Sequence, residues 1–168
     1  TAPAEIVKIP GARPSIYIAN MVGAALWAAI WDHSVQDFKI KKVFDFKKNK
    51  ADMVQELFFN HESSHLYVTT AVKGEMFIFE VLNETLELKF LKRIKAGAGS
   101  KQVVIDSNRR YAFVQNSFLN LPGMSDGSIA VIDLKDHKKI KSMTTLKDKG
   151  LNAMGITLLP EWTYAKFN

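Results

Sequence analysis

The stretches IYIAN at residues 16–20, LYVTT at 66–70 and AFVQN at 112–116 are three versions of one short pattern. Each places an aromatic side chain beside aliphatic ones and ends in small or polar residues. The aromatic residues lie 50 and then 46 residues apart, a spacing typical of repeats that contain four strands. The pattern therefore predicts a chain built from repeated units of this length.

Two strand-like segments follow the aromatic pattern in every unit. The first is apolar and ends in an acidic residue, and these acids are Asp32, Glu80 and Asp133. The second alternates apolar and charged residues, as a strand with one face in solvent does. Its three copies are residues 38–46, 86–94 and 138–146.

A last segment is almost continuously apolar, as expected of a strand buried on both faces. Its copies are residues 54–59, 103–105 and, with a weaker match, 154–159. Each unit then reads as a buried, an aromatic, an acid-ended and an outer strand. Helices are disfavoured because no stretch holds a 3.6-residue period with caps at both ends.

Four-stranded antiparallel units that repeat along the chain predict an all-β fold of the β-propeller type. We expect three blades within residues 15–160, at about 15–60, 61–106 and 107–160. Residues 1–14 form a lead-in that looks like the end of a preceding blade, and 161–168 form a tail. Three blades are an incomplete ring, since propellers have about four to eight.

These repeats resemble the YVTN β-propeller family, within the superfamily of YncE-like and quinoprotein amine dehydrogenase-like propellers. The best match is IAVIDL at residues 129–134, and the resemblance covers residues 15–160. It implies a WD40-like repeat fold and little about chemistry, because one fold hosts many functions. Enzymes of that superfamily include lactonases, haem nitrite reductases and amine dehydrogenase subunits, and YVTN repeats also occur in archaeal surface layers.

Composition limits the kinds of site that the chain can carry. It has 168 residues and no cysteine, which excludes disulfides, zinc–thiolate sites and cysteine nucleophiles. The longest apolar run, residues 21–31, is too short to cross a bilayer. The net charge of +6 favours acidic partners, but the lysines are dispersed, so we expect no nucleic-acid site and no cofactor.

His61-Glu62-Ser63-Ser64-His65 is a literal H-E-x-x-H sequence. In zinc proteases this spacing works on a helix, where both histidines share one face. Here the repeat places it in the turn before an aromatic strand, with Asn60 aligned to Asp106. The sequence therefore predicts no metal site at His61 and His65, and it shows no catalytic set.

The third unit carries about seven extra residues before its acid-ended strand. Large apolar side chains fill this insertion, which makes it the best candidate for a partner-binding loop. We predict that it shares one end of the blades with several lysines, which would suit a protein with an acidic patch. The predicted contact residues are Phe118, Leu119, Leu121, Met124, Lys48, Lys95 and Lys101.

The sequence thus predicts a non-catalytic interaction or scaffold propeller, an exported accessory subunit in the periplasm or outside the cell. Its expected partners are a protein, the remaining blades of the ring or further copies of itself. Two alternatives stay open: part of a propeller enzyme, such as a periplasmic oxidoreductase or a lactonase-like protein, and a cell-surface structural repeat protein.

Overall fold

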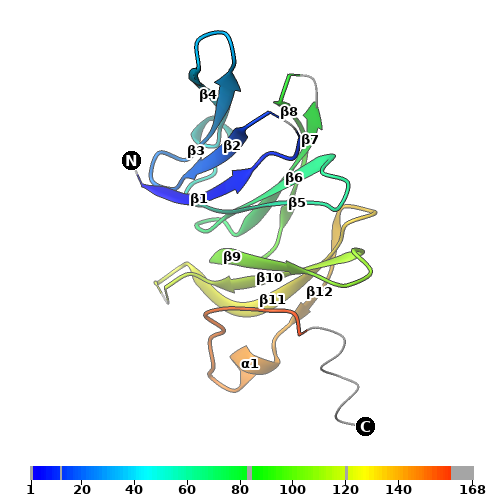
Figure 1. Cartoon of the computed structure of the whole chain (residues 1–168). Helices are drawn as coiled ribbons and strands as arrows, with labels where there is room; N and C mark the ends of the chain where they lie inside the picture. Colours follow the sequence, from blue (N-terminus) through cyan, green and yellow to red (C-terminus); the bar gives the residue numbers. More distant parts are fainter. Residues whose placement is uncertain (1, 12, 83–84, 120, 160–168) are drawn as a thin grey trace.

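The computed structural model describes residues 2–11, 13–82, 85–119 and 121–159. These residues form three four-stranded antiparallel sheets in chain order, a partial β-propeller (Figure 1). The all-β prediction is confirmed. In the described part of the chain, no helix is long and apolar enough to span a membrane.

Each sheet is one blade, and its strands pair in sequence order. Blade 1 contains β1 (Pro3–Lys8), β2 (Ser15–Asn20), β3 (Ala25–Asp32) and β4 (Asp37–Asp45). Blade 2 contains β5 (Val54–Phe59), β6 (His65–Thr70), β7 (Glu75–Leu82) and β8 (Glu87–Lys95). Blade 3 contains β9 (Ser100–Ile105), β10 (Tyr111–Ser117), β11 (Ser125–Asp133) and β12 (Lys138–Met143). A 3-10 turn, η1 (Lys47–Asn49), and a short helix, α1 (Thr145–Asp148), lie outside the sheets.

The structure departs from the sequence expectation at both ends of the array. β1 lies in the lead-in segment and pairs with β2 as the first strand of blade 1, with Ile6 opposite Ile18. Residues 154–159 form no strand here. The apolar run at 154–159 instead lies along blade 3, where the amide N–H of Ile156 donates to the Gln102 side chain at 3.3 Å.

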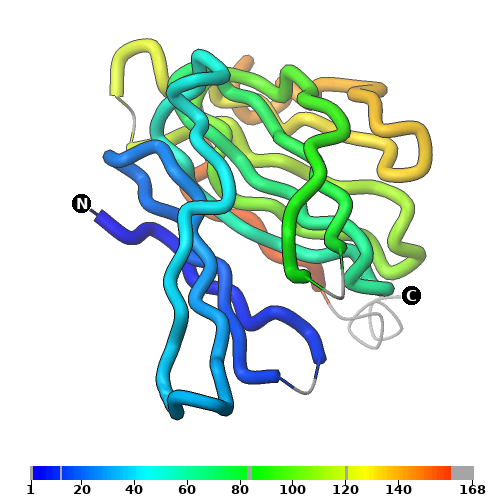
Figure 2. The backbone as a smooth tube through the Cα atoms, turned by 90° about the horizontal axis from the view of Figure 1, so that it is seen from above, coloured from blue at the N-terminus to red at the C-terminus, as the bar shows by residue number. Residues whose placement is uncertain are grey.

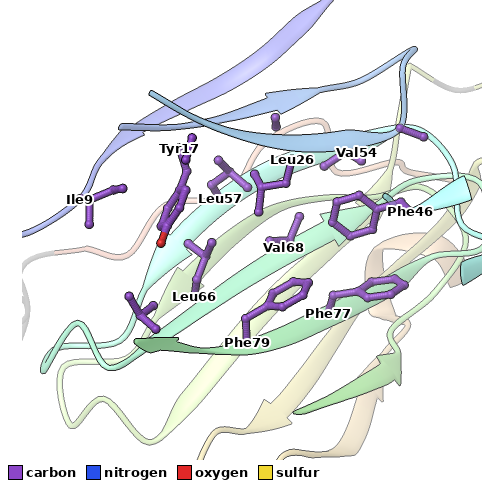
Figure 3. Packing of buried hydrophobic residues seen from close by; sticks show 14 of the residues in the cluster. Ile9, Tyr17, Leu26, Phe46, Val54, Leu57, Leu66, Val68, Phe77 and Phe79 are labelled. Carbon is purple, nitrogen blue, oxygen red and sulfur yellow. The ribbon is translucent and has the colours of Figure 1, made fainter. Parts of the chain in front are cut away.

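The core is formed where one blade packs on the next. We call the side of a blade that points to the preceding blade its leading face, and the opposite side its trailing face. Tyr17 and Leu26 on the trailing face of blade 1 pack into one buried cluster with Val68, Phe77 and Phe79 on the leading face of blade 2 (Figure 3). Side chains alternate between the two sides along each strand, so each central strand contributes to two seams.

The second seam repeats the first, one blade later. Tyr67 and Ile78 on the trailing face of blade 2 pack with Ala112, Val114 and Ile132 on the leading face of blade 3. Tyr67 and Ile78 align with Tyr17 and Ala28, so side chains at equivalent positions fill both seams. The internal sequence repeat is therefore a repeat of the packing surface.

Aromatic rings fill the first seam most densely. Phe44 and Phe46 of blade 1 meet Phe77 and Phe79 of blade 2, with ring centroids 4.8 Å apart for Phe44–Phe79 and 5.0 Å for Phe46–Phe77. The Tyr17 hydroxyl crosses the seam and donates to the Leu86 carbonyl at 2.9 Å. Burial raises the pKa of the Tyr17 phenol above its ordinary value, so this hydroxyl stays a donor.

Repeated polar turns fix the ends of the strands. The Asn60 side chain accepts the His65 amide N–H at 2.8 Å, and the Asp106 side chain accepts the Tyr111 amide N–H at 2.7 Å. The predicted alignment of Asn60 with Asp106 is thus confirmed as one turn motif used twice. Asp32 and Asp133 likewise accept backbone N–H groups two residues on, at 2.8 and 2.9 Å, so they close their strands structurally.

The leading face of blade 1 has no blade against it among the described residues. Ile16, Ile18 and Trp27 lie there, half-buried, at the positions where blade 2 has Leu66, Val68 and Phe77, which are fully buried. Ile40, paired through Ala29 to Ile16, is 65% exposed. This face has the apolar side chains of a seam, but no blade packs against it within the described residues.

Replacement of two phenylalanines of blade 2 should lower the free energy of unfolding by unequal amounts, because only one of them is fully buried in a seam. Phe77→Ala should lower the free energy of unfolding by about 3–5 kcal/mol, because it removes a fully buried ring. Phe90→Ala, on the outer strand with 42% of its side chain exposed, should cost about 1 kcal/mol. Urea denaturation of both variants measures the difference, and equal costs would contradict the assigned packing.

Glu56 links the innermost strands of blades 2 and 3. Its carboxylate accepts the Val103 amide N–H at 2.6 Å. Burial, together with the nearby charge of Glu5, raises the pKa of Glu56 to about 7, against the pull of the Val103 hydrogen bond. The folded chain therefore holds a proton on Glu56 at a pH where the unfolded chain, with its ordinary pKa of 4.5, has released it.

This shift predicts that Glu56 lowers stability as the pH rises from about 4.5 through about 7, since the unfolded state binds fewer protons there. Glu56→Gln keeps an acceptor for the Val103 amide and cannot ionise. It should gain about 1 kcal/mol over the unmodified chain at pH 8, after allowance for partial exposure, and little at pH 4.5. Thermal unfolding at both pH values checks this, and a gain that does not depend on pH would refute it.

Candidate interaction surface and turn pocket

The two ends of the blades differ in what they present. One end, which we call the loop face, gathers the β2–β3, β6–β7 and β10–β11 loops and the links between blades. The other, the turn face, gathers the β1–β2 and β3–β4 turns of blade 1 and the equivalent turns β5–β6, β7–β8, β9–β10 and β11–β12 of blades 2 and 3. Alternation of antiparallel strands dictates this division. The predicted loop lies on the loop face.

Backbone hydrogen bonds hold the loop that joins β10 to β11. The Phe118 amide donates to the Met124 carbonyl at 2.9 Å, and the Met124 amide donates to the Leu121 carbonyl at 2.9 Å. Gly99, from the link between blades 2 and 3, lies so close that a Cβ there would be 1.9 Å from the Met124 carbonyl oxygen. Any side chain at residue 99 would push the loop away, so the glycine lets the loop dock on the neighbouring blade.

The loop holds its apolar side chains in two different environments. Phe118 is buried and Met124 is half-buried, whereas Leu119 and Leu121 are 56% and 39% exposed. Leu119 also has a φ of +51°, a left-handed conformation that costs a leucine free energy. Phe118, predicted as a contact residue, is thus an anchor that positions the two exposed leucines.

The predicted lysines lie at the same end but in different settings. Lys48 is exposed in η1, and the exposed Lys95 ammonium donates to the Lys73 carbonyl of the β6–β7 loop. Lys101 is half-buried on β9. Lys147 forms an ion pair of 3.4 Å with Asp126, beside the loop. The structure therefore places a basic rim at this end, with Lys101 less accessible than predicted.

The turn face carries a pocket of about 830 Å³ between blades 2 and 3, which we call the turn pocket. Three turns line it: residues 60–65, 106–110 and 134–137. Its apolar wall is formed by Phe59, Tyr67, Ile105 and Leu134, and its polar wall includes His61, Glu62, His65, Arg109, Arg110, Lys135 and His137. A volume of this size suits a small molecule.

The H-E-x-x-H sequence lies at this pocket and not on a helix. His61 is in the β5–β6 turn, and His65 begins β6. The His65 Nδ1 atom lies 3.0 Å from the Ser64 hydroxyl, and the Glu62 carboxylate accepts the Asn60 amide at 2.9 Å. In the described part of the chain, no group of three potential ligands is arranged for a metal ion.

The turn pocket was not predicted from the sequence as a site. The fold brings His137, in the β11–β12 turn, to within 5.5 Å of His65, measured between ring centroids. The available signal was the repeat itself, since aligned turns of adjacent blades must meet at one seam. The sequence alone does not give the angle between blades, so it could not show that the turns enclose a pocket.

Structural comparison supports the fold and only the fold. A candidate 6-phosphogluconolactonase from Bacteroides fragilis has a TM-score of 0.63 and 15% identity, over 84% of this chain and 38% of its own. A protein from Lactobacillus plantarum gives 0.64 and 17%, over 83% and 41%. A β-propeller domain from Myceliophteria thermophila gives 0.56 and 12%, over 84% and 43%.

The chain therefore spans about two fifths of the length of each of these three structures. No protein-family description matches the sequence, and no curated protein matches it either. The solved structures thus support a partial β-propeller fold. A function has to be argued from the residues of the candidate sites.

The turn geometry predicts weak zinc binding at His61 and His65. A turn cannot hold two imidazoles at tetrahedral zinc distances as a helix does. After dialysis against micromolar zinc, elemental analysis should find well under one equivalent, and His61→Ala should not change that amount. One equivalent of zinc that is lost in the His61→Ala variant would show that the turn rearranges to bind metal.

Proposed function

We propose that the chain forms three consecutive blades of a larger, YVTN-type β-propeller that acts as a non-catalytic protein-interaction scaffold. In this proposal the loop that carries Leu119 and Leu121 is the docking element for a protein partner. In the same proposal the intact protein is an exported accessory subunit, periplasmic or extracellular.

The observation that carries the docking role is the preformed loop. Its backbone is fixed by hydrogen bonds and by the close approach of Gly99, and its buried Phe118 anchors it. Because Leu119 and Leu121 are held in place before binding, little conformational entropy is lost when a partner covers them. Exposed apolar groups on a fixed loop, near basic side chains, are typical of an interface with an acidic rim.

The observation that supports additional blades is the open leading face of blade 1. Three of its residues occupy positions that are fully buried in blade 2, yet here they are only partly covered. Burial of apolar surface contributes about 25 cal/mol per Å², so a further blade or another copy of the chain would bind this face favourably. Blade 3 differs because residues 151–159 partly cover its trailing face, where the Gln115 side chain donates to the Ala153 carbonyl at 2.5 Å.

A second candidate function is part of a propeller enzyme. The observation in its favour is the turn pocket, where His65 and His137 lie beside Tyr67. Imidazoles in a partly apolar pocket are common acid–base groups. Catalysis would need a substrate-dependent reaction that is lost in His137→Gln, whereas the scaffold proposal expects none.

Photo-crosslinking tests the docking role. A photoreactive amino acid at Leu119 should give a discrete adduct with one protein in the cells that produce the chain. The same probe at Ile140, which is 50% exposed on the outer strand β12, serves as the matched control. Identical adducts at both positions, or none at Leu119, would contradict the proposal; so would an adduct at Leu119 that survives Leu121→Ser unchanged.

A further inference from the structure

The two seams are repeats, yet they close differently at the turn face. In the first seam the β7–β8 turn of blade 2 places Leu86 at Tyr17, and both Leu86 and Ser15, the first residue of β2, are buried. In the second seam the β11–β12 turn of blade 3 places His137 over Tyr67, with ring centroids 6.3 Å apart. His137 and Leu86 occupy the same turn position, each immediately before the outer strand, and have φ angles of 48° and 56°.

Two positions carry a histidine in the second seam where the first seam has another residue. Ser15 begins β2 and its counterpart His65 begins β6, so a serine–leucine pair in the first seam corresponds to a histidine–histidine pair in the second. The two imidazoles lie 5.5 Å apart at an interplanar angle of 62°. Both are half-buried and line the turn pocket. The first seam, where Ser15 and Leu86 are buried, is therefore an internal comparison for the second seam, where His65 and His137 line a pocket.

Three cations, Arg109, Arg110 and Lys135, and two carboxylates, Glu62 and Asp106, line the turn pocket. The Asp106 carboxylate accepts hydrogen bonds from two backbone N–H groups, and the Glu62 carboxylate accepts one from the side-chain amide of Asn60. Arg110 pairs with Asp133 at 2.9 Å. For Arg109 and Lys135, which are exposed at the rim, no ion pair is found within the described residues. Two cations are therefore available at the rim to a ligand that enters the pocket.

The surroundings of His137 disfavour its protonated form. Burial lowers the pKa of His137, and the neighbouring His65 and Lys92 lower it further, while Asp133 acts in the opposite direction. The charged groups that act on His137 are His65 on β6, Lys92 on β8 and Asp133 at the end of β11, while Tyr67, Glu62 and Arg110 line the same pocket. An anion in the pocket would offset the repulsion and favour the protonated imidazole.

We propose that the turn pocket binds a small polyanionic molecule, bearing carboxylate or phosphate groups, and that binding is coupled to protonation of His137. Arg109 and Lys135 draw the anionic groups to the rim. His137, with His65 beside it, donates hydrogen bonds from its ring once it is protonated. The apolar wall of Phe59, Ile105 and Leu134 accommodates the carbon skeleton. This site lies on the turn face, opposite the docking loop, and does not rest on the scaffold proposal.

Calorimetric titration of the full chain with citrate and with pyrophosphate, at constant ionic strength, tests the assignment. At least one probe should bind about tenfold more tightly at pH 5.5 than at pH 7.5, with net proton uptake, because the anion raises the pKa of the group it contacts. Tighter binding of citrate would assign a carboxylate ligand, and tighter binding of pyrophosphate a phosphorylated one. Failure of both probes at both pH values would overturn the proposal.

Three variants separate binding from folding. His137→Leu reproduces the closed seam of Leu86, so it should fold, unfold at an equal or higher temperature, and lose both binding and proton uptake. His137→Gln keeps a polar side chain and should abolish the pH dependence. Arg109→Gln should weaken binding about tenfold at both pH values. Unchanged affinity and proton uptake in folded His137→Gln would refute the role of His137 even if His137→Leu failed to fold.

Discussion

The packing of one blade's trailing face onto the next blade's leading face is the interaction on which this structure depends. A single four-stranded sheet of this kind is apolar on both sides and cannot be stable in water alone. Among the described residues, only blade 2 packs between two other blades, and it contributes fully buried rings, among them Phe77 and Phe79. Blades 1 and 3 each share one seam with blade 2, and Figure 2 shows the backbone running from blade 1 through blade 2 to blade 3.

This constraint also explains where variation is tolerated. Seam positions keep their apolar character from blade to blade, because each side chain must fit a neighbour that repeats. Loops and turns at the two ends are outside that requirement. The blades differ at the insertion after β10 and at the residue before the outer strand, which is Gln36, Leu86 or His137. We locate function at the insertion and at His137.

Much of the fold could be predicted from the sequence, since strand type follows from side-chain periodicity and the 46- to 50-residue spacing defines the unit. The ends of the array could not. The lead-in at residues 1–14 was predicted as the end of a preceding blade, whereas β1 belongs to blade 1, and that assignment rests on its pairing with β2. Residues 154–159 have the composition of a buried strand, but in this structure they lie along blade 3 without strand pairing. Leu119 and Leu121 are exposed on a docked loop, and their role in binding stays a prediction. The approach of His137 to His65 could not be predicted, because it depends on the angle between blades.

Hydrogen–deuterium exchange tests the central claim, that stability resides in the seams and that the array is open at its leading end. The account predicts that the amides of β6 and β7, covered on both sides, exchange most slowly, and that those of β2 and β3 exchange faster. Extension of the chain by a preceding blade should then slow β2 and β3 to the level of β6 and β7. Uniform protection of the three blades in the isolated chain, or no change in β2 and β3 on extension, would contradict it.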